Sequence, residues 1–154
     1  MAAGEDKEHV PLPPLVYLAG ILLGLGIDYL IPVRVFPGAL QQPVGALLMA
    51  LGVGLALVSV VTLYRAGTSP LHERPTTTIV PGGVFTWSRN PIYVGMTLIC
   101  VGLAVFFDRV WVVAGTVPAV LVIHFIVIAR EEAFLEAKFG QAYLDYKRQV
   151  RRWI

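Results

Sequence analysis

The sequence is poor in charged residues and in cysteine. Only 14% of its 154 residues are charged, whereas a soluble domain has about 25%. Cys100 is the single cysteine, which excludes a disulfide framework and a metal site built on several thiolates. The formal net charge of +2 is too small to favour nucleic acid as a partner. The chain has no glycine-rich dinucleotide fingerprint, phosphate loop or zinc-binding spacing, so the common soluble cofactor-binding classes are excluded.

What the sequence has instead is apolar residues, which make up 56% of the chain. Four apolar runs have about the length that crosses a bilayer core, which needs roughly 20 residues. We therefore predict an all-α integral membrane protein with four transmembrane helices, forming one domain over residues 1–154. The predicted spans are at about 14–31, 43–64, 91–107 and 110–129, with a tail at 1–13 and a polar loop at 65–90. Because the start of the chain is polar and the first apolar run is long, we expect no cleavable signal peptide.

Small residues recur along the first two spans. Gly20 and Gly24 are four residues apart, and Gly45 and Gly52 are one heptad apart. Such faces let two helix backbones approach closely, so we interpret these residues as packing sites. The same interpretation is given to a third set at four-residue spacing, Ala46, Ala50 and Gly54.

After Arg130 the composition becomes polar. Within residues 130–154 the apolar positions recur at steps of three and four, which predicts an amphipathic helical segment lying at the membrane interface. Gly140 is the expected break in this segment. The apolar positions are Leu135, Phe139, Tyr143, Tyr146 and Val150.

The basic residues are distributed unequally between the two sides of the predicted membrane. One side holds only Arg34 and Arg109. The loop and the C-terminal segment hold Arg65, Arg74, Arg89, Arg130, Lys138, Lys147, Arg148, Arg151 and Arg152. By the positive-inside rule, both termini and the long loop are cytoplasmic, and we expect the plasma membrane of a prokaryote. Asp28, at the far end of the first span, is interpreted as an interfacial residue.

Several residues on the cytoplasmic side are candidates for chemistry. Asn90-Pro91 reads as a helix start, with Asn90 as N-cap. Glu131 and Glu132 end a membrane helix where the dipole favours cations, and they either balance nearby charges or bind a ligand. His124 lies seven residues before Glu131, on the same face of a regular helix, and is either a packing residue or part of a site. Tyr143 and Tyr146 are either interfacial anchors or the wall of a pocket.

Three segments taken together resemble the isoprenylcysteine carboxyl methyltransferase-like family of integral membrane methyltransferases, which is also related to phospholipid methyltransferases. Their order and separation agree with the family pattern over roughly residues 65–154, while residues 1–60 match only in hydropathy. The segments are Arg89-Asn90-Pro91-Ile92-Tyr93-Val94-Gly95, His124 followed by Glu131-Glu132, and Phe139-Gly140 with Tyr143, Tyr146 and Val150.

The resemblance implies a methyltransferase that uses S-adenosylmethionine. It implies that the cofactor enters from the cytoplasm and lies between the last membrane helices and the C-terminal segment, while a lipophilic acceptor arrives from the bilayer. The implied catalytic residues are Arg89, His124 and Glu132, and on this assignment Glu132→Ala should abolish cofactor binding without unfolding the protein. The implied cofactor-binding residues are Pro91, Tyr93, Gly95, His124, Glu131, Glu132, Tyr143 and Tyr146.

Two positions depart from the family pattern. Many members have His at the position of Asn90 and a basic residue at that of Gln149, for which Arg148 or Arg151 would substitute. Both departures weaken the case for a prenylcysteine carboxylate as acceptor, so a carboxylate, a thiol and a lipid amine all stay open. A carboxylate needs a cation such as Arg89, whereas a thiol or an amine needs a base such as His124 or a glutamate.

Two other function classes compete with a methyltransferase. A non-enzymatic four-helix membrane protein, such as an assembly subunit or a small-solute carrier, is the first; a carrier is expected to have polar groups near the middle of the bilayer. In this chain the ionisable residues gather on one side instead. The second class is a sterol-reductase-like protein with a nicotinamide cofactor, for which the chain is short. The sequence sets no oligomeric state.

Overall fold

The computed structural model describes residues 11–36, 38–68 and 78–154. The start of the predicted tail and the middle of the predicted loop, with Arg74, lie outside the described residues. The regular elements of the described residues are all helical. They are α1 (Pro13–Leu30), α2 (Gly38–Arg65), a 3-10 turn (Gly83–Thr86), α3 (Pro91–Phe106), α4 (Val110–Val122), a π turn (Ile123–Val127), α5 (Ile128–Phe139) and α6 (Gln141–Gln149).

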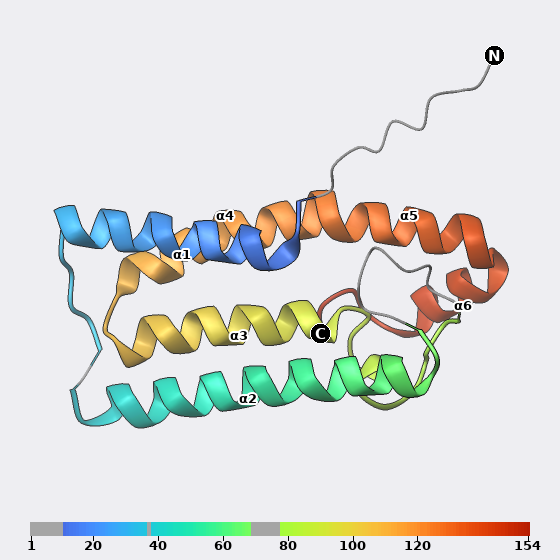
Figure 1. Ribbon diagram of the computed structural model, residues 1–154, viewed down its shortest axis with the longest axis horizontal. Coiled ribbons are helices and arrows are strands. Elements are labelled where there is room, and N and C mark those ends of the chain that lie inside the picture. Colours follow the sequence, from blue (N-terminus) through green and yellow to red (C-terminus); the bar gives the residue numbers. More distant parts are fainter. Residues whose placement is uncertain (1–10, 37, 69–77) are drawn as a thin grey trace, which may run out of the picture.

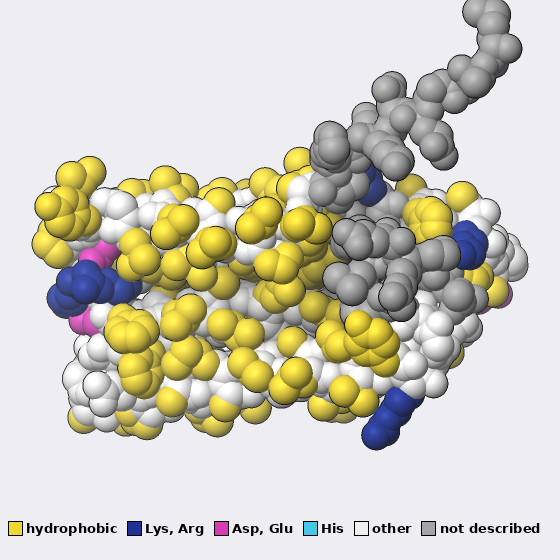
Figure 2. Space-filling model, viewed as in Figure 1, with side chains coloured by type: hydrophobic (Ala, Val, Ile, Leu, Met, Phe, Trp, Pro, Cys, Tyr) yellow, Lys and Arg dark blue, Asp and Glu magenta, His cyan; other side chains and the backbone are white. Residues whose placement is uncertain are grey.

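The helices form two antiparallel pairs, α1 with α4 and α2 with α3 (Figure 1). Three continuous helical stretches are long and apolar enough to cross a membrane: Pro13–Leu30, Gly38–Arg65 and Val110–Phe139. The apolar helix α3 is shorter. Large apolar side chains, including Leu22 and Leu51, are exposed on the outside of the bundle, where a soluble protein would carry polar groups (Figure 2). The all-helical integral membrane fold is therefore confirmed, while the count of four spans stays a prediction.

Glycines allow the two helices within each pair to pack at close range. A Cβ atom added to Gly20 would lie 2.5 Å from the Gly115 carbonyl oxygen, and one added to Gly52 would lie 2.6 Å from that of Gly95. Real Cβ atoms do not approach this closely, so only glycine allows these contacts. The prediction for these small residues is confirmed, but that for the set containing Gly54 is wrong. A Cβ on Gly54 would meet nothing within 4 Å, because two residues after Gly52 the helix has turned this position outward.

Ionic contacts close the end of the bundle opposite α5 and α6. Asp28 is only 1% exposed and pairs with Arg34 at 2.8 Å and also with Arg109. Asp108, in the turn between α3 and α4, accepts hydrogen bonds from the backbone N–H of Val35 at 2.9 Å and of Phe36 at 3.1 Å. Asp28 therefore lies at the end of its helix, as expected, and its role is to join the α1–α2 connection to the α3–α4 turn.

The helix that contains the fourth predicted span continues beyond residue 129. From Val110 the helix runs through α4, the π turn and α5 to Phe139, a continuous stretch of 30 residues (Figure 1). Its first part is apolar and its last part is polar. The chain then turns at Gly140, which has a φ of 55°, a value that glycine adopts without steric cost. The expected break at Gly140 is confirmed. Its consequence is that α6 folds back beside the end of the bundle instead of extending the helix.

Candidate functional site

The loop before α3 and the polar helix α5 meet in a buried ion pair. The Nη2 atom of Arg89 lies 2.9 Å from Oε1 of Glu132, and the two side chains are 8% and 6% exposed. Two residues that are far apart in the sequence are thus brought together by the antiparallel return of α3 and α4.

Two further cations surround the same carboxylate. Arg152 places Nε 3.1 Å from Oε1 of Glu132 and Nη2 2.5 Å from Oε2. The Nζ atom of Lys147 lies 3.7 Å from Oε2, and this lysine also pairs with Glu136. A buried carboxylate requires such partners, because an isolated charge in this environment costs several kcal/mol. The cluster around Glu132 consequently carries more positive than negative charge.

A π turn decides which glutamate faces this cluster. The backbone N–H of Ile128 donates to the carbonyl of Ile123, five residues back, so the turn holds one more residue than an α-helical turn. The extra residue brings His124 into line with Glu132, and both contact Arg152. The expectation that His124 shares a face with Glu131 is therefore wrong, because it assumed a regular helix.

The C-terminal residues enter the site. The Nη1 atom of Arg152 lies 3.2 Å from Nε2 of His124, and Nε1 of Trp153 donates to Nδ1 of the same ring at 2.9 Å. The indole stacks on the imidazole with the ring planes 17° apart. Neither Arg152 nor Trp153 was a predicted site residue. The substitutes expected for the basic residue missing at position 149 do not serve here, because Arg148 pairs with Asp145 at the surface and residue 151 is exposed.

The segment that starts α3 is bound to this tail. The backbone N–H of Arg89 donates to the Arg151 carbonyl at 3.0 Å, and the side-chain amide of Asn90 donates to the Arg152 carbonyl at 2.9 Å. Helix α3 begins at Pro91, as predicted, but the Asn90 side chain makes no capping hydrogen bond. Asn90 is therefore the N-cap residue, as predicted, and its side-chain amide binds the tail. The departure from histidine at this position thus has a structural role in docking the C-terminus.

The predicted residues of α3 point in different directions. The Tyr93 hydroxyl is buried and donates to Oε1 of Glu131 at 2.6 Å, which places this pair beside the cluster on α5. Gly95 instead packs against the backbone of Gly52 on α2. The structure therefore brings Tyr93 to the site and places Gly95 at a helix contact away from it.

Tyr143 and Tyr146 lie inside the protein. They are 3% and 9% exposed, so the interpretation as lipid-facing anchors is wrong. The Tyr146 hydroxyl donates to the Phe85 carbonyl at 2.7 Å, and burial raises the pKa of Tyr146 to about 12. Burial, reinforced by the charge of Glu132, also raises the pKa of Tyr143. Both side chains are therefore neutral at physiological pH and act as hydroxyl donors and ring surfaces.

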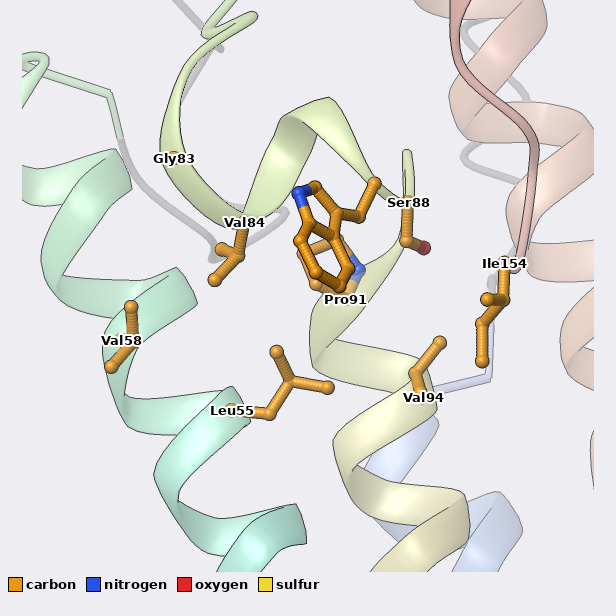
Figure 3. Close-up of a pocket in the computed structure, with 9 residues that line it drawn as sticks. Leu55, Val58, Gly83, Val84, Ser88, Pro91, Val94 and Ile154 are labelled. Carbon is orange, nitrogen blue, oxygen red and sulfur yellow. The ribbon is translucent and has the colours of Figure 1, made fainter.

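An apolar cavity lies beside the segment that leads into α3 (Figure 3). It has a volume of about 530 Å³ and lies between α2, the 3-10 turn, the start of α3 and the C-terminal Ile154. Ser88 and Pro91 line it on either side of the segment that carries Arg89. The remaining lining residues are Leu55, Val58, Gly83, Val84, Trp87 and Val94. Pro91 is the one predicted site residue in this lining, so the cavity itself was not foreseen.

Among the residues that the structure describes, no group of three or more histidine, cysteine, aspartate or glutamate side chains is arranged to hold a metal ion. The site thus consists of arginines, acids, one histidine and tyrosines, and none of these side chains lines the apolar cavity.

Comparisons with known proteins bear on the family and the fold of the chain. The chain is 38% identical over 63 residues to an uncharacterised protein of Haemophilus influenzae, covering 41% of this chain and all of that protein. It is 34% identical over 97 residues to the protein-S-isoprenylcysteine O-methyltransferase of Rattus norvegicus, covering 58% of this chain and 34% of the relative.

The fold is similar to the solved structure of the eukaryotic intramembrane Ras methyltransferase ICMT (isoprenylcysteine carboxyl methyltransferase). The TM-score is 0.67 at 22% identity, covering 97% of this chain and 54% of that one. The chain spans about a third of the length of the curated methyltransferases it matches. Residues 40–142, about two thirds of the sequence, match the phospholipid methyltransferase family. The match over α2, α3, α4 and α5 shows that this chain belongs to that family of membrane methyltransferases.

Proposed function

We propose that the protein transfers a methyl group from S-adenosylmethionine to a lipophilic acceptor at the membrane. Family membership supports the reaction class. The observation that carries the proposal is that the segment bearing Arg89, which pairs with Glu132, also contributes Ser88 and Pro91 to the lining of an apolar cavity. The charged cluster and the apolar cavity together suit an acceptor that has a polar reacting group and a hydrocarbon chain.

The residues at the site fit the cofactor by charge and by hydrogen bonding. Arg89 has a buried Nε donor without a partner among the described residues, and the cluster has an excess of cations, both of which suit the carboxylate of the cofactor. The residues that would hold the cofactor are those of the prediction without Gly95: Pro91, Tyr93, His124, Glu131, Glu132, Tyr143 and Tyr146. When bound, the cofactor supplies an activated methyl group.

The protein's own contribution is to orient the acceptor and to exclude water. Alignment of two reactants is worth several kcal/mol, and the apolar walls formed by Leu55, Val58 and Val94 would hold the acceptor's hydrocarbon part. Arg89 would orient an acceptor carboxylate. Several cations contact Glu132, so it anchors the arginines. A thiol or amine acceptor would need a base, for which Glu131 is the candidate, because each nitrogen of His124 faces an N–H donor.

Glu132 on α5 and Arg152 after α6 place the cluster at the end of the bundle where α5 and α6 lie (Figure 1). By the distribution of basic residues, this end faces the cytoplasm, where the cofactor is available. The proposal thus includes cytoplasmic termini, four spans and the plasma membrane of a prokaryote.

A thermal-shift measurement in detergent tests the cofactor. S-Adenosylhomocysteine at 100 times its Kd should stabilise the protein by about 2.7 kcal/mol, and nicotinamide nucleotides should not. Stabilisation by nicotinamide nucleotides alone would favour the reductase alternative. No stabilisation by either compound would favour a non-enzymatic membrane protein.

A further inference from the structure

The imidazole of His124 faces a hydrogen-bond donor at each of its nitrogens. Nε1 of Trp153 lies 2.9 Å from Nδ1, and Nη1 of Arg152 lies 3.2 Å from Nε2. An indole N–H and a guanidinium N–H can only donate. Both partners of the ring therefore require an acceptor nitrogen.

No protonation state of His124 satisfies both partners. A neutral imidazole accepts at one nitrogen and carries a proton on the other, and a protonated ring accepts at neither. The shorter contact, with Trp153, assigns the acceptor to Nδ1. The proton is then on Nε2, where it faces the Nη1 donor of Arg152. Two donors thus face each other at 3.2 Å, an unfavourable contact that a ligand acceptor would relieve by accepting from both as they move apart.

A second donor in the cluster also lacks an acceptor. Nε of Arg89 is buried and has no hydrogen-bond partner among the described residues. Glu132 cannot easily serve it, because its two oxygens already face Arg89 Nη2, two nitrogens of Arg152 and the amine of Lys147. Arg89 thus contacts this carboxylate through Nη2 and not through Nε, and the contact of Lys147, at 3.7 Å, is an ion pair without a hydrogen bond.

The charges in the cluster indicate the sign of the missing group. Lys147 is paired with Glu136 as well, which leaves the guanidinium groups of Arg89 and Arg152 against the single carboxylate of Glu132. Both guanidinium groups approach Oε1 of that carboxylate, at 2.9 and 3.1 Å, so they lie side by side. A second anion would compensate the remaining positive charge.

We propose that the site binds a ligand carboxylate at Arg152, with one oxygen that accepts from both Arg152 Nη1 and His124 Nε2 once these two nitrogens move apart from their 3.2 Å contact. Arg152 is then the residue that recognises the carboxylate, and Trp153 is a positioning residue that keeps the proton of His124 on Nε2. The inference rests on the proposed function and refines it. The carboxylate belongs either to the cofactor or to a lipophilic acceptor.

Isothermal titration in detergent tests the proposal with two pairs of probes. S-Adenosylhomocysteine carries the carboxylate that 5′-methylthioadenosine lacks, and dodecanoate carries the charge that its methyl ester lacks. In the wild-type protein, one pair should show tighter binding of the carboxylate member. Arg152→Gln should weaken that member by roughly 10- to 150-fold, the range for a hydrogen bond to a charged group, and leave its partner unchanged. The pair that responds identifies the source of the carboxylate.

Three other variants separate recognition from folding. Arg152→Lys keeps the charge but loses the planar fork, so its loss should be intermediate. Trp153→Phe removes the donor at Nδ1, so the proton of His124 can move to Nδ1 and Nε2 can accept from Arg152 without a ligand. This variant should therefore also weaken binding of the carboxylate-bearing probe selectively. Arg148→Gln removes an exposed arginine paired with Asp145 and should change neither pair.

Two outcomes are decisive against the proposal. If Arg152→Gln and Arg152→Lys weaken both members of each pair equally, or neither member, the arginine does not recognise a carboxylate. Wild-type protein that binds neither adenosine compound contradicts the proposed cofactor, and the dodecanoate pair then still decides the carboxylate site. The melting temperature of each variant shows that the titrated protein is folded.

Discussion

The buried carboxylate of Glu132 should support the fold as well as the site. Its side chain is 6% exposed and pairs with Arg89, which is 8% exposed. Removing one partner of a buried ion pair leaves the other charge uncompensated and costs about 3–5 kcal/mol. The pairs with Arg152 and Lys147, whose side chains are 27% and 34% exposed, add little because solvent screens them. Glu132→Ala should therefore lower the free energy of unfolding by about 3–5 kcal/mol.

This expectation differs from the one based on the sequence, in which Glu132→Ala lost only cofactor binding. The assay is unfolding in detergent without ligand, compared with Glu136→Ala as the control. Glu136 is 35% exposed and its pair with Lys147 is at the surface, so that variant should cost less than about 1 kcal/mol.

A double variant tests the physical cause. Glu132→Gln with Arg89→Gln removes both charges of the buried pair, and should be more stable than Glu132→Gln alone because no uncompensated charge remains. If Glu132→Ala unfolds at the same free energy as wild type, or if the double variant is simply the sum of the single ones, the buried ion pair does not stabilise the protein as argued.

Two further predictions concern packing and acid. Gly95→Ala places a Cβ 2.6 Å from the Gly52 carbonyl oxygen and should destabilise the α2–α3 pair by about 1–3 kcal/mol. The control, Gly54→Ala, should cost nothing in the same unfolding assay. Equal melting of the two variants would contradict the packing argument. Hydrogen bonds from the backbone, of which that from Val35 has the largest effect, hold the pKa of Asp108 below its usual value. Its contribution to stability is therefore present above about pH 3.9 and is lost as the pH falls through the lower folded-state pKa. Asp108→Asn should remove that acid-dependent loss, and an unchanged pH profile of unfolding would refute the assignment.

The sequence by itself determined the class of protein and most of the helix positions. Runs of apolar residues need no tertiary information to be recognised as membrane helices, and the starts at Pro91 and Val110 follow from local signals. The close approach at Gly20 and Gly52 was predictable because small residues at regular spacing have one main use in such helices. The family relation was also visible, since its motif residues lie in a fixed order along the chain.

The site could be predicted in its residue types and only partly in its geometry. Arg89, His124 and Glu132 meet as the motifs indicated, whereas Gly95 belongs to a helix contact. Arg152 was missed because no local pattern distinguishes it from its basic neighbours. Its role appears only when the C-terminal tail is docked on the loop before α3.

The tertiary structure decided what depends on contacts between distant segments. Periodicity fixes the face of a residue only while the helix stays regular, so the π turn at residues 123–127 changed which glutamate lies beside His124. The cavity combines side chains from α2, α3 and Ile154, whose meeting no local pattern encodes. Local propensity therefore set the helices, and long-range packing set the direction in which their functional side chains point.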